Sequence, residues 1–227
     1  MVRLTASKFG RAALLPLFAL AFGACAPAAT RSATECTVPA GTLVDIRSTD
    51  PTIRTEIRYA TTNNFTGRRL PGYETPRALL RPEAAAALAR VQARLRAEGL
   101  GLKVWDAYRP VRATLAMVDW AERTGNQWVL DQGYVARQSG HNLGGTVDLT
   151  LIRLDTGREL EMGTPYDEFS ERAHTANASG TVAENRQRLV RAMAAEGFAN
   201  YEKEWWHFRR PGEYEPLDAP LACFRAA

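Results

Sequence analysis

Residues 139–151 read SGHNLGGTVDLTL and join a glycine-rich turn to a strongly apolar segment. His141 precedes the turn, and Asp148 lies inside the apolar segment, which we predict to be a buried strand over 146–154. A carboxylate in a buried strand costs several kcal/mol unless it has a partner. The sequence therefore predicts a metal ion or an arginine next to Asp148.

A second histidine, His207, lies in EWWHF, residues 204–208, three residues after Glu204. Two imidazoles and a carboxylate are a common ligand set for catalytic zinc, which keeps its fourth position for water. Zinc makes that water acidic, and a nearby carboxylate then accepts its proton. Glu204 is the candidate base. Glu204 and His207 would point to opposite faces of a regular strand, so we predict a bulge or a strand end between them. The alternative is that both histidines are packing residues.

Around these motifs the sequence predicts a mixture of helices and strands without strict βαβ alternation, and hence an α+β domain. A Thr181–Glu184 pair indicates a capping box at the start of the last helix. The predicted helices cover 82–98, 110–124 and 181–196, and the predicted strands cover 43–47, 53–59, 102–105, 146–154 and 203–209.

Composition excludes several other classes. The 227 residues are 45% hydrophobic and 24% charged, which is typical of a globular protein and not of collagen, a coiled coil or a disordered chain. The net charge of +4 owes three charges to Arg3, Lys8 and Arg11, so the remainder carries 29 − 3 = 26 basic against 25 acidic residues. This balance gives no support for a nucleic-acid partner.

The N-terminus resembles a secretory signal. Three basic residues precede an apolar run over 12–24, which is too short to span a membrane comfortably. FGAC, residues 22–25, fits a bacterial lipobox imperfectly and would make Cys25 the lipidated first residue; ordinary cleavage near Ala26–Ala28 is the alternative. We favour the lipoprotein, and expect a signal peptide over 1–24, a tether over 25–40 and a catalytic domain over 41–227. The expected location is the periplasm, with a lipid anchor in the outer membrane as the one contact with a membrane.

Two cysteines remain, Cys36 and Cys223. An even number of cysteines in an exported protein usually pairs, so we expect a disulfide between them. The alternative is two free thiols.

The two histidine motifs resemble the S-x-H-x-x-G-x-x-x-D and E-W-W-H segments of the zinc D,D-peptidase superfamily. Three further segments occur in the order found in its D-alanyl-D-alanine dipeptidases of the VanX type. They are YATTNNFTGRRLPGYE (59–74), DAYRP (106–110) and MGTPYD (162–167). The resemblance covers residues 59–208 and implies a single domain with a small, mainly antiparallel sheet flanked by helices, the fold shared with hedgehog-type modules.

The resemblance also implies roles for individual residues. It implies one zinc ion held by His141, Asp148 and His207, Glu204 as the catalytic base, and Arg109 as the group that polarises the scissile carbonyl. The substrate-binding residues that it implies are Asp167 for the free ammonium, and Ser139, Tyr59 and Tyr73 as pocket lining. The chain departs from the family at HNLGG (141–145), where Leu143 replaces an arginine. His174 matches no ligand position.

The expected function is zinc-dependent hydrolysis of the free dipeptide D-Ala-D-Ala in cell-wall peptide turnover. The first alternative is a D,D- or L,D-carboxypeptidase that trims peptidoglycan stem peptides, and Asp167 argues against it because it suits a substrate with one residue before the scissile bond. The second alternative is a catalytically silent zinc-binding module, and the presence of both Glu204 and Arg109 argues against it.

Overall fold

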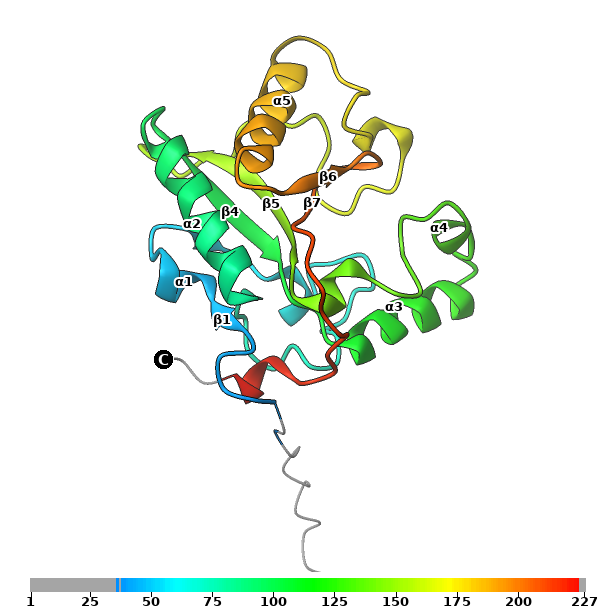
Figure 1. The fold of residues 1–227 in the computed structure, drawn as a ribbon. Coiled ribbons are helices and arrows are strands. Elements are labelled where there is room, and N and C mark those ends of the chain that lie inside the picture. The colour runs from blue at the N-terminus through cyan, green and yellow to red at the C-terminus, as the bar shows by residue number, and fades with distance from the viewer. Residues whose placement is uncertain (1–35, 37, 225–227) are drawn as a thin grey trace, which may run out of the picture. The chain divides into compact units, whose positions relative to one another are not determined.

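A computed structural model describes residue 36 and residues 38–224 of the chain (Figure 1). The predicted signal peptide, Cys25 and most of the tether lie outside the described residues. Within the described part, no helix has the length and apolar character needed to cross a bilayer.

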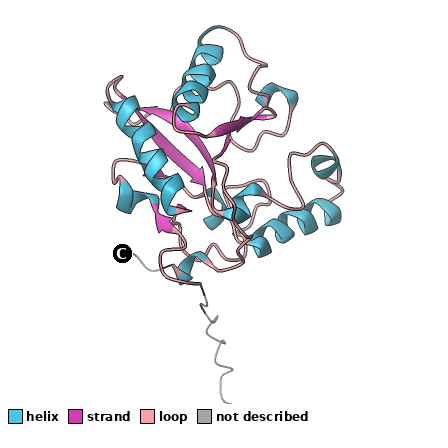
Figure 2. Cartoon of the chain, in the orientation of Figure 1, coloured by secondary structure: helices cyan, strands magenta, loops and turns pink. Residues whose placement is uncertain are grey.

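The centre of the domain is a five-stranded sheet (Figure 2). Its outer pair β2–β4 is parallel and the other three pairs are antiparallel, which confirms the mainly antiparallel sheet. In spatial order the strands are β2 (Arg54–Thr55), β4 (Leu100–Asp106), β5 (Thr146–Arg153), β7 (Glu204–Arg209) and β6 (Ala199–Tyr201). A separate antiparallel pair joins β1 (Val44–Asp45) to β3 (Leu79–Leu80).

Two long helices pack against the sheet and against each other, α2 on β4 and α5 on β5 and β6 (Figure 1). Pro82 is the first residue of α2, a position whose backbone N–H would have no partner within the helix. The apolar stripe Leu88, Val91 and Leu95 of this helix is buried. The α-helices are α1 (Ile46–Thr49), α2 (Pro82–Arg96), α3 (Val111–Arg123), α4 (Trp128–Asp131) and α5 (Gly180–Ala194), and short 3₁₀ turns occupy Arg58–Ala60, Gly140–Leu143, Glu171–Ala173 and Leu221–Cys223.

The prediction of strands over 43–47 and 53–59 is largely wrong. The first segment turns into α1 after two residues, because Asp45 caps that helix through its side chain. In the second, Ile53, Ile57 and Tyr59 are buried as the alternation suggested, but only Arg54–Thr55 pairs as a strand before a 3₁₀ turn. Alternating burial here reflects an extended segment at the sheet edge.

The predicted capping box at Thr181–Glu184 is also wrong, since α5 begins at Gly180 after Ser179 without a side-chain cap. A capping box forms elsewhere, in the 3₁₀ turn that carries His141. There the Ser139 hydroxyl accepts from the His141 N–H at 3.2 Å, and the Asn142 side chain accepts from the Ser139 N–H at 3.0 Å.

A disulfide joins Cys36 to Cys223, with their Cα atoms 5.2 Å apart, as expected from the cysteine count. It links the start of the described chain to its last 3₁₀ turn, and Figure 1 shows these blue and red segments lying side by side.

Candidate active site

Three polar residues form a row across the centre of the sheet. Asp148 on β5 is paired directly with Asp106 on β4 and with His207 on β7. Directly paired residues share one face of a sheet, so the three side chains lie next to each other. A register shift between Val104 and Asp106 gives β4 an irregularity at the edge of this row.

A bulge in β7 brings Glu204 to the same place. Tyr201 pairs with Glu204, but Asn200 pairs with Phe208, so β7 contains extra residues between these two points. The Asn200 amide donates to the carbonyls of both Glu204 and His207, at 3.1 and 3.0 Å, and thereby holds the bulge. The predicted bulge is confirmed, and a Glu204 oxygen lies 3.6 Å from His207 Nδ1.

His141 reaches the row from the 3₁₀ turn before β5 and is 1% exposed. Its Nδ1 lies 2.7 Å from the Ala107 carbonyl, which can only accept, so Nδ1 carries the proton and donates it. In the neutral imidazole the lone pair is then on Nε2, which lies 3.3 Å from both Asp148 Oδ2 and His207 Nδ1. Such an outer hydrogen bond is typical of a metal-binding histidine.

The donor atoms of His141, Asp148 and His207 all lie within 4.8 Å of one another. Asp148 Oδ1 is buried, and none of the described residues makes a well-directed hydrogen bond to it, although His207 Nδ1 is 3.0 Å away. Burial alone would raise the pKa of Asp148, but His141 and His207 outweigh it and hold that pKa below its ordinary value. An anionic oxygen beside two imidazoles is the ligand set that zinc prefers. The residues fit a zinc ion.

The charge balance of the cavity also favours cations. Its lining includes the carboxylates of Asp148, Asp167 and Glu204 but only one guanidinium, that of Arg109. Burial raises the pKa of Glu204 well above its ordinary value, and the charges of Asp148 and Asp167 raise it further. A carboxylate with a raised pKa is suited to exchange a proton near neutral pH.

Arg109 is held by a buried carboxylate that the sequence analysis did not single out. Its Nε and Nη2 donate to Asp106 Oδ2 at 3.0 and 2.9 Å, while the Tyr73 hydroxyl donates to Asp106 Oδ1 at 2.6 Å. Asp106 is fully buried, and Arg109 lies over the Tyr59 ring with its guanidinium carbon 5.0 Å from the ring centroid. Asp106 and Arg109 are both in DAYRP, so their three-residue spacing could have indicated that they form a pair.

Asp167 has an incomplete set of partners. The Tyr59 hydroxyl donates to its Oδ1 at 2.9 Å, but Oδ2 is buried, and nothing in the described chain hydrogen-bonds to it. Burial raises the pKa of Asp167 to about 7, against the opposing hydrogen bond from Tyr59. Among the described residues it is also the one non-glycine residue at positive φ, 63°. Asp167 Oδ2, which lacks a hydrogen-bond donor, is suited to accept a hydrogen bond from a cationic group.

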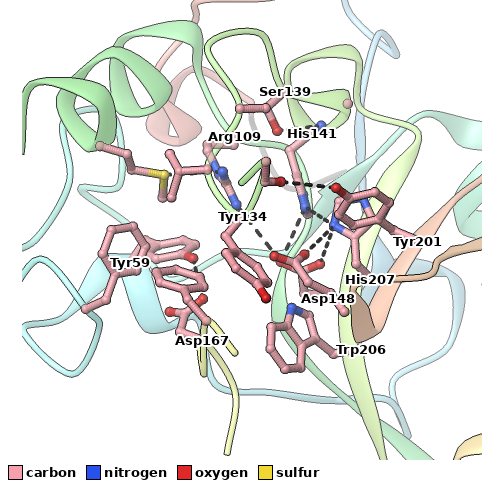
Figure 3. Close-up of a pocket in the computed structure, with 18 residues that line it drawn as sticks. Tyr59, Arg109, Tyr134, Ser139, His141, Asp148, Asp167, Tyr201, Trp206 and His207 are labelled. Atoms are coloured by element: carbon pink, nitrogen blue, oxygen red, sulfur yellow. Dashed lines mark hydrogen bonds and ion pairs between the residues drawn. The ribbon is translucent and has the colours of Figure 1, made fainter. Parts of the chain in front are cut away.

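These groups open into one cavity of about 270 Å³ (Figure 3). Tyr59 and Ser139 line it as predicted, together with an apolar wall that the sequence analysis missed, formed by Phe65, Met117, Tyr134 and Phe169. The prediction for Tyr73 is wrong. That side chain is fully buried behind Asp106, and its hydroxyl is already used there.

His174 stays apart from the metal ligands, as expected. Its Nε2 lies 3.1 Å from the Tyr134 hydroxyl, and its backbone carbonyl accepts from Arg186. It follows a 3₁₀ turn at Glu171–Ala173 in the long connection between β5 and α5.

Comparison with known proteins agrees with this geometry. The family model described as D-Ala-D-Ala dipeptidase (peptidase M15) matches residues 40–227. Three relatives are each called D-alanyl-D-alanine dipeptidase. The Enterococcus faecium protein is 38% identical over 69% of this chain and 85% of its own length. The Streptomyces coelicolor protein is 38% identical over 75% and 93%. The Escherichia coli protein is 36% identical over 80% and 92%.

Proposed function

Since this chain belongs to the peptidase M15 family of D-Ala-D-Ala dipeptidases, we propose that it hydrolyses free D-Ala-D-Ala into two D-alanines. The observation that carries this proposal is the buried, unpartnered oxygen of Asp167 in the cavity that also holds the metal-ligand cluster. A substrate with its ammonium on Asp167 has room for one residue before the scissile bond.

The cofactor is zinc, held by His141, Asp148 and His207. When bound, zinc supplies a Lewis acid that lowers the pKa of a coordinated water toward neutrality. Glu204 is the base that takes the proton and passes it to the leaving amine. Burial raises the pKa of Glu204, which makes its carboxylate a stronger proton acceptor than that of an exposed glutamate.

Arg109 stabilises the negative charge that develops on the scissile carbonyl oxygen. Its Nε and Nη2 are occupied by Asp106, while Nη1 is 3.2 Å from the weakly accepting Met117 sulfur. Burial would lower the pKa of Arg109, but Asp106 outweighs it, so the guanidinium stays charged. A fixed cation of this kind stabilises the transition state more than the ground state.

Asp167 and Tyr59 orient the other end of the substrate. Burial raises the pKa of the Tyr59 hydroxyl, so it remains a neutral donor to Asp167 Oδ1. Asp167 Oδ2 is then left for the ammonium of the substrate. The alternative function, a D,D- or L,D-carboxypeptidase, has no use for an ammonium-binding carboxylate, because its substrates continue past that position as an amide.

The test measures D-alanine release from D-Ala-D-Ala and from an N-blocked D,D-tripeptide, with and without a chelator. We expect rapid release from the free dipeptide only, and its loss on chelation. Preferential cleavage of the blocked tripeptide would identify a carboxypeptidase, and no cleavage of either peptide by the zinc-loaded protein would identify a silent module.

We also propose that the protein acts outside the cytoplasm, in turnover of cell-wall peptides, as an exported and lipid-anchored enzyme. Two observations support this proposal. At the N-terminus, basic residues are followed by an apolar run and then by Cys25, and the cysteine pair Cys36–Cys223 is suited to an oxidising compartment. Fractionation of cells that express the parent or Cys25→Ser checks this. We expect membrane-bound parent and soluble or unprocessed variant, and a parent found in the soluble periplasmic fraction would exclude the anchor.

A further inference from the structure

Arg186 on α5 is a buried cation with unusual partners. It is 1% exposed, and no carboxylate of the described chain lies within ion-pair distance of it. Its guanidinium instead donates to three backbone carbonyls at close range, Met162 at 2.8 Å, His174 at 2.7 Å and Arg172 at 3.0 Å. An arginine without a counter-ion is costly to bury unless its donors are satisfied, so these bonds define its role.

The three carbonyls belong to one segment of the chain, the segment that contains Asp167. They lie on either side of Asp167, Met162 before it and Arg172 and His174 after it, within the connection between β5 and α5 that has little regular structure. Arg186 therefore ties together the two sides of the segment 162–174, which contains Asp167. Gly163 lies directly against it, since a Cβ at Gly163 would be 3.1 Å from Arg186 Nη2 and 2.8 Å from a Val182 methyl.

The segment needs such support because Asp167 is held in a disfavoured backbone conformation, with φ at 63°. Conformations of this kind persist where the surroundings determine them. Other bonds also fix the segment, from Trp205 Nε1 to the Thr164 hydroxyl at 2.8 Å and from the Tyr166 hydroxyl to Asp148 at 2.9 Å. Arg186 connects the part before Asp167 with the part after it through three short bonds, and the only other direct link among the described residues is a longer one of 3.4 Å, from Arg172 Nη2 to the Gly163 carbonyl.

We propose that Arg186 is a positioning residue that sets the place of the Asp167 carboxylate by clamping the carbonyls of Met162, Arg172 and His174. The proposal deepens the proposed function, because it assumes that Asp167 receives the substrate ammonium. Arg186 touches neither the substrate nor the metal ligands, so its loss acts on recognition of the free amine and leaves the zinc site in place.

The kinetic test compares Arg186→Lys and Arg186→Gln with Arg191→Lys, a matched control on an exposed position of the same helix. Neither replacement has a planar fork that spans three carbonyls. We expect KM for D-Ala-D-Ala to rise about tenfold or more, as for a lost hydrogen bond to a charged group, with kcat changed much less. The rate on N-acetyl-D-Ala-D-Ala and the zinc content stay unchanged, and Arg191→Lys resembles the parent.

Amide hydrogen exchange tests the clamp without any substrate. Peptides from 162–177 should exchange faster in Arg186→Lys than in the parent or in Arg191→Lys, while β5 and β7 keep their protection. Unchanged exchange over 162–177 would overturn the proposal, as would an unchanged KM in an active variant. If the parent itself shows no preference for the free dipeptide, the proposed function has failed, and the exchange result still decides the role of Arg186.

Discussion

Asp148 on β5 lies directly opposite His207 on β7, and this pairing places His207 Nδ1 3.0 Å from Asp148 Oδ1. The metal site is thus built on hydrogen-bonded strands, with only His141 coming from a turn. Ligands fixed by a sheet keep their relative geometry because neither strand can shift without breaking its ladder.

Removal of a ligand should release the metal. His141→Ala should lose most of the bound zinc, because only two of the three protein ligands remain. His174→Ala should retain the zinc, because His174 contacts Tyr134 and not the metal ligands. Metal content measured by atomic emission after dialysis checks this. Full zinc occupancy in His141→Ala would exclude this ligand set.

Glu204→Gln should bind zinc normally and lose about 10²–10⁴-fold or more in kcat, because an amide cannot accept and return a proton. The substitution preserves size, so the bulge in β7 should form as before. Steady-state rates on the metal-loaded variant decide the matter. Turnover close to that of the parent would mean that another group is the base.

Asp106→Asn should impair turnover although it lines no part of the cavity. An amide oxygen still accepts from Arg109, but the buried guanidinium loses its closer counter-charge and keeps only Asp148 at 4.0 Å; removing one partner of a buried pair typically costs about 3–5 kcal/mol. We expect lower kcat and a lower melting temperature together.

Arg109→Lys should lower kcat with retained zinc, because the point charge of an ammonium cannot replace the planar set of donors of a guanidinium.

Binding of the free dipeptide should weaken on acidification. With its pKa raised to about 7, Asp167 is increasingly protonated as the pH falls below that value, and a neutral carboxyl attracts an ammonium poorly. KM for D-Ala-D-Ala should therefore rise between pH 8 and pH 6 in the parent. In Asp167→Asn, KM should be high and much less dependent on pH. Parallel pH profiles in the two proteins would remove Asp167 from ammonium binding.

N-acetylation of the substrate should act like loss of Asp167. The acetyl group removes the positive charge and leaves the buried carboxylate unpaired, at a cost of about 3–5 kcal/mol. Acetylated D-Ala-D-Ala should thus be a very poor substrate of the parent, and Asp167→Ala should narrow the difference by harming only the free dipeptide. Equal rates on both substrates in the parent would favour an open, carboxypeptidase-like cleft.

The sequence could indicate the residues that meet at the zinc site, because two short motifs each place a histidine near a carboxylate and the family resemblance joins the two motifs in one site. It also indicated the bulge in β7, since Glu204 and His207 have opposite parity. It could not predict that Asp106 completes the row with Asp148, because that depends on the register between β4 and β5. For the same reason Tyr73 was placed in the pocket, whereas the fold puts it behind Asp106.

Weak local signals failed where tertiary packing decided the outcome. The short strand β6 escaped prediction, because its three residues gain order mainly from pairing with β7. The apolar wall of the cavity combines Phe65, Tyr134 and Phe169, whose rings meet from three separate loops. Nothing in their local sequence distinguishes them from ordinary core residues.

The disulfide between Cys36 and Cys223 closes the domain into a covalent ring, because the two residues are 187 positions apart yet adjacent in space. A protease that cuts once in an exposed turn, such as Asp155–Thr156 after β5, leaves a single connected molecule until the bridge is reduced. The same adjacency means that a short peptide linker could replace the bridge and new termini could be opened at that turn. In such a circularly permuted chain the helices and strands would follow one another in a different order, yet they would surround the zinc site in the same way.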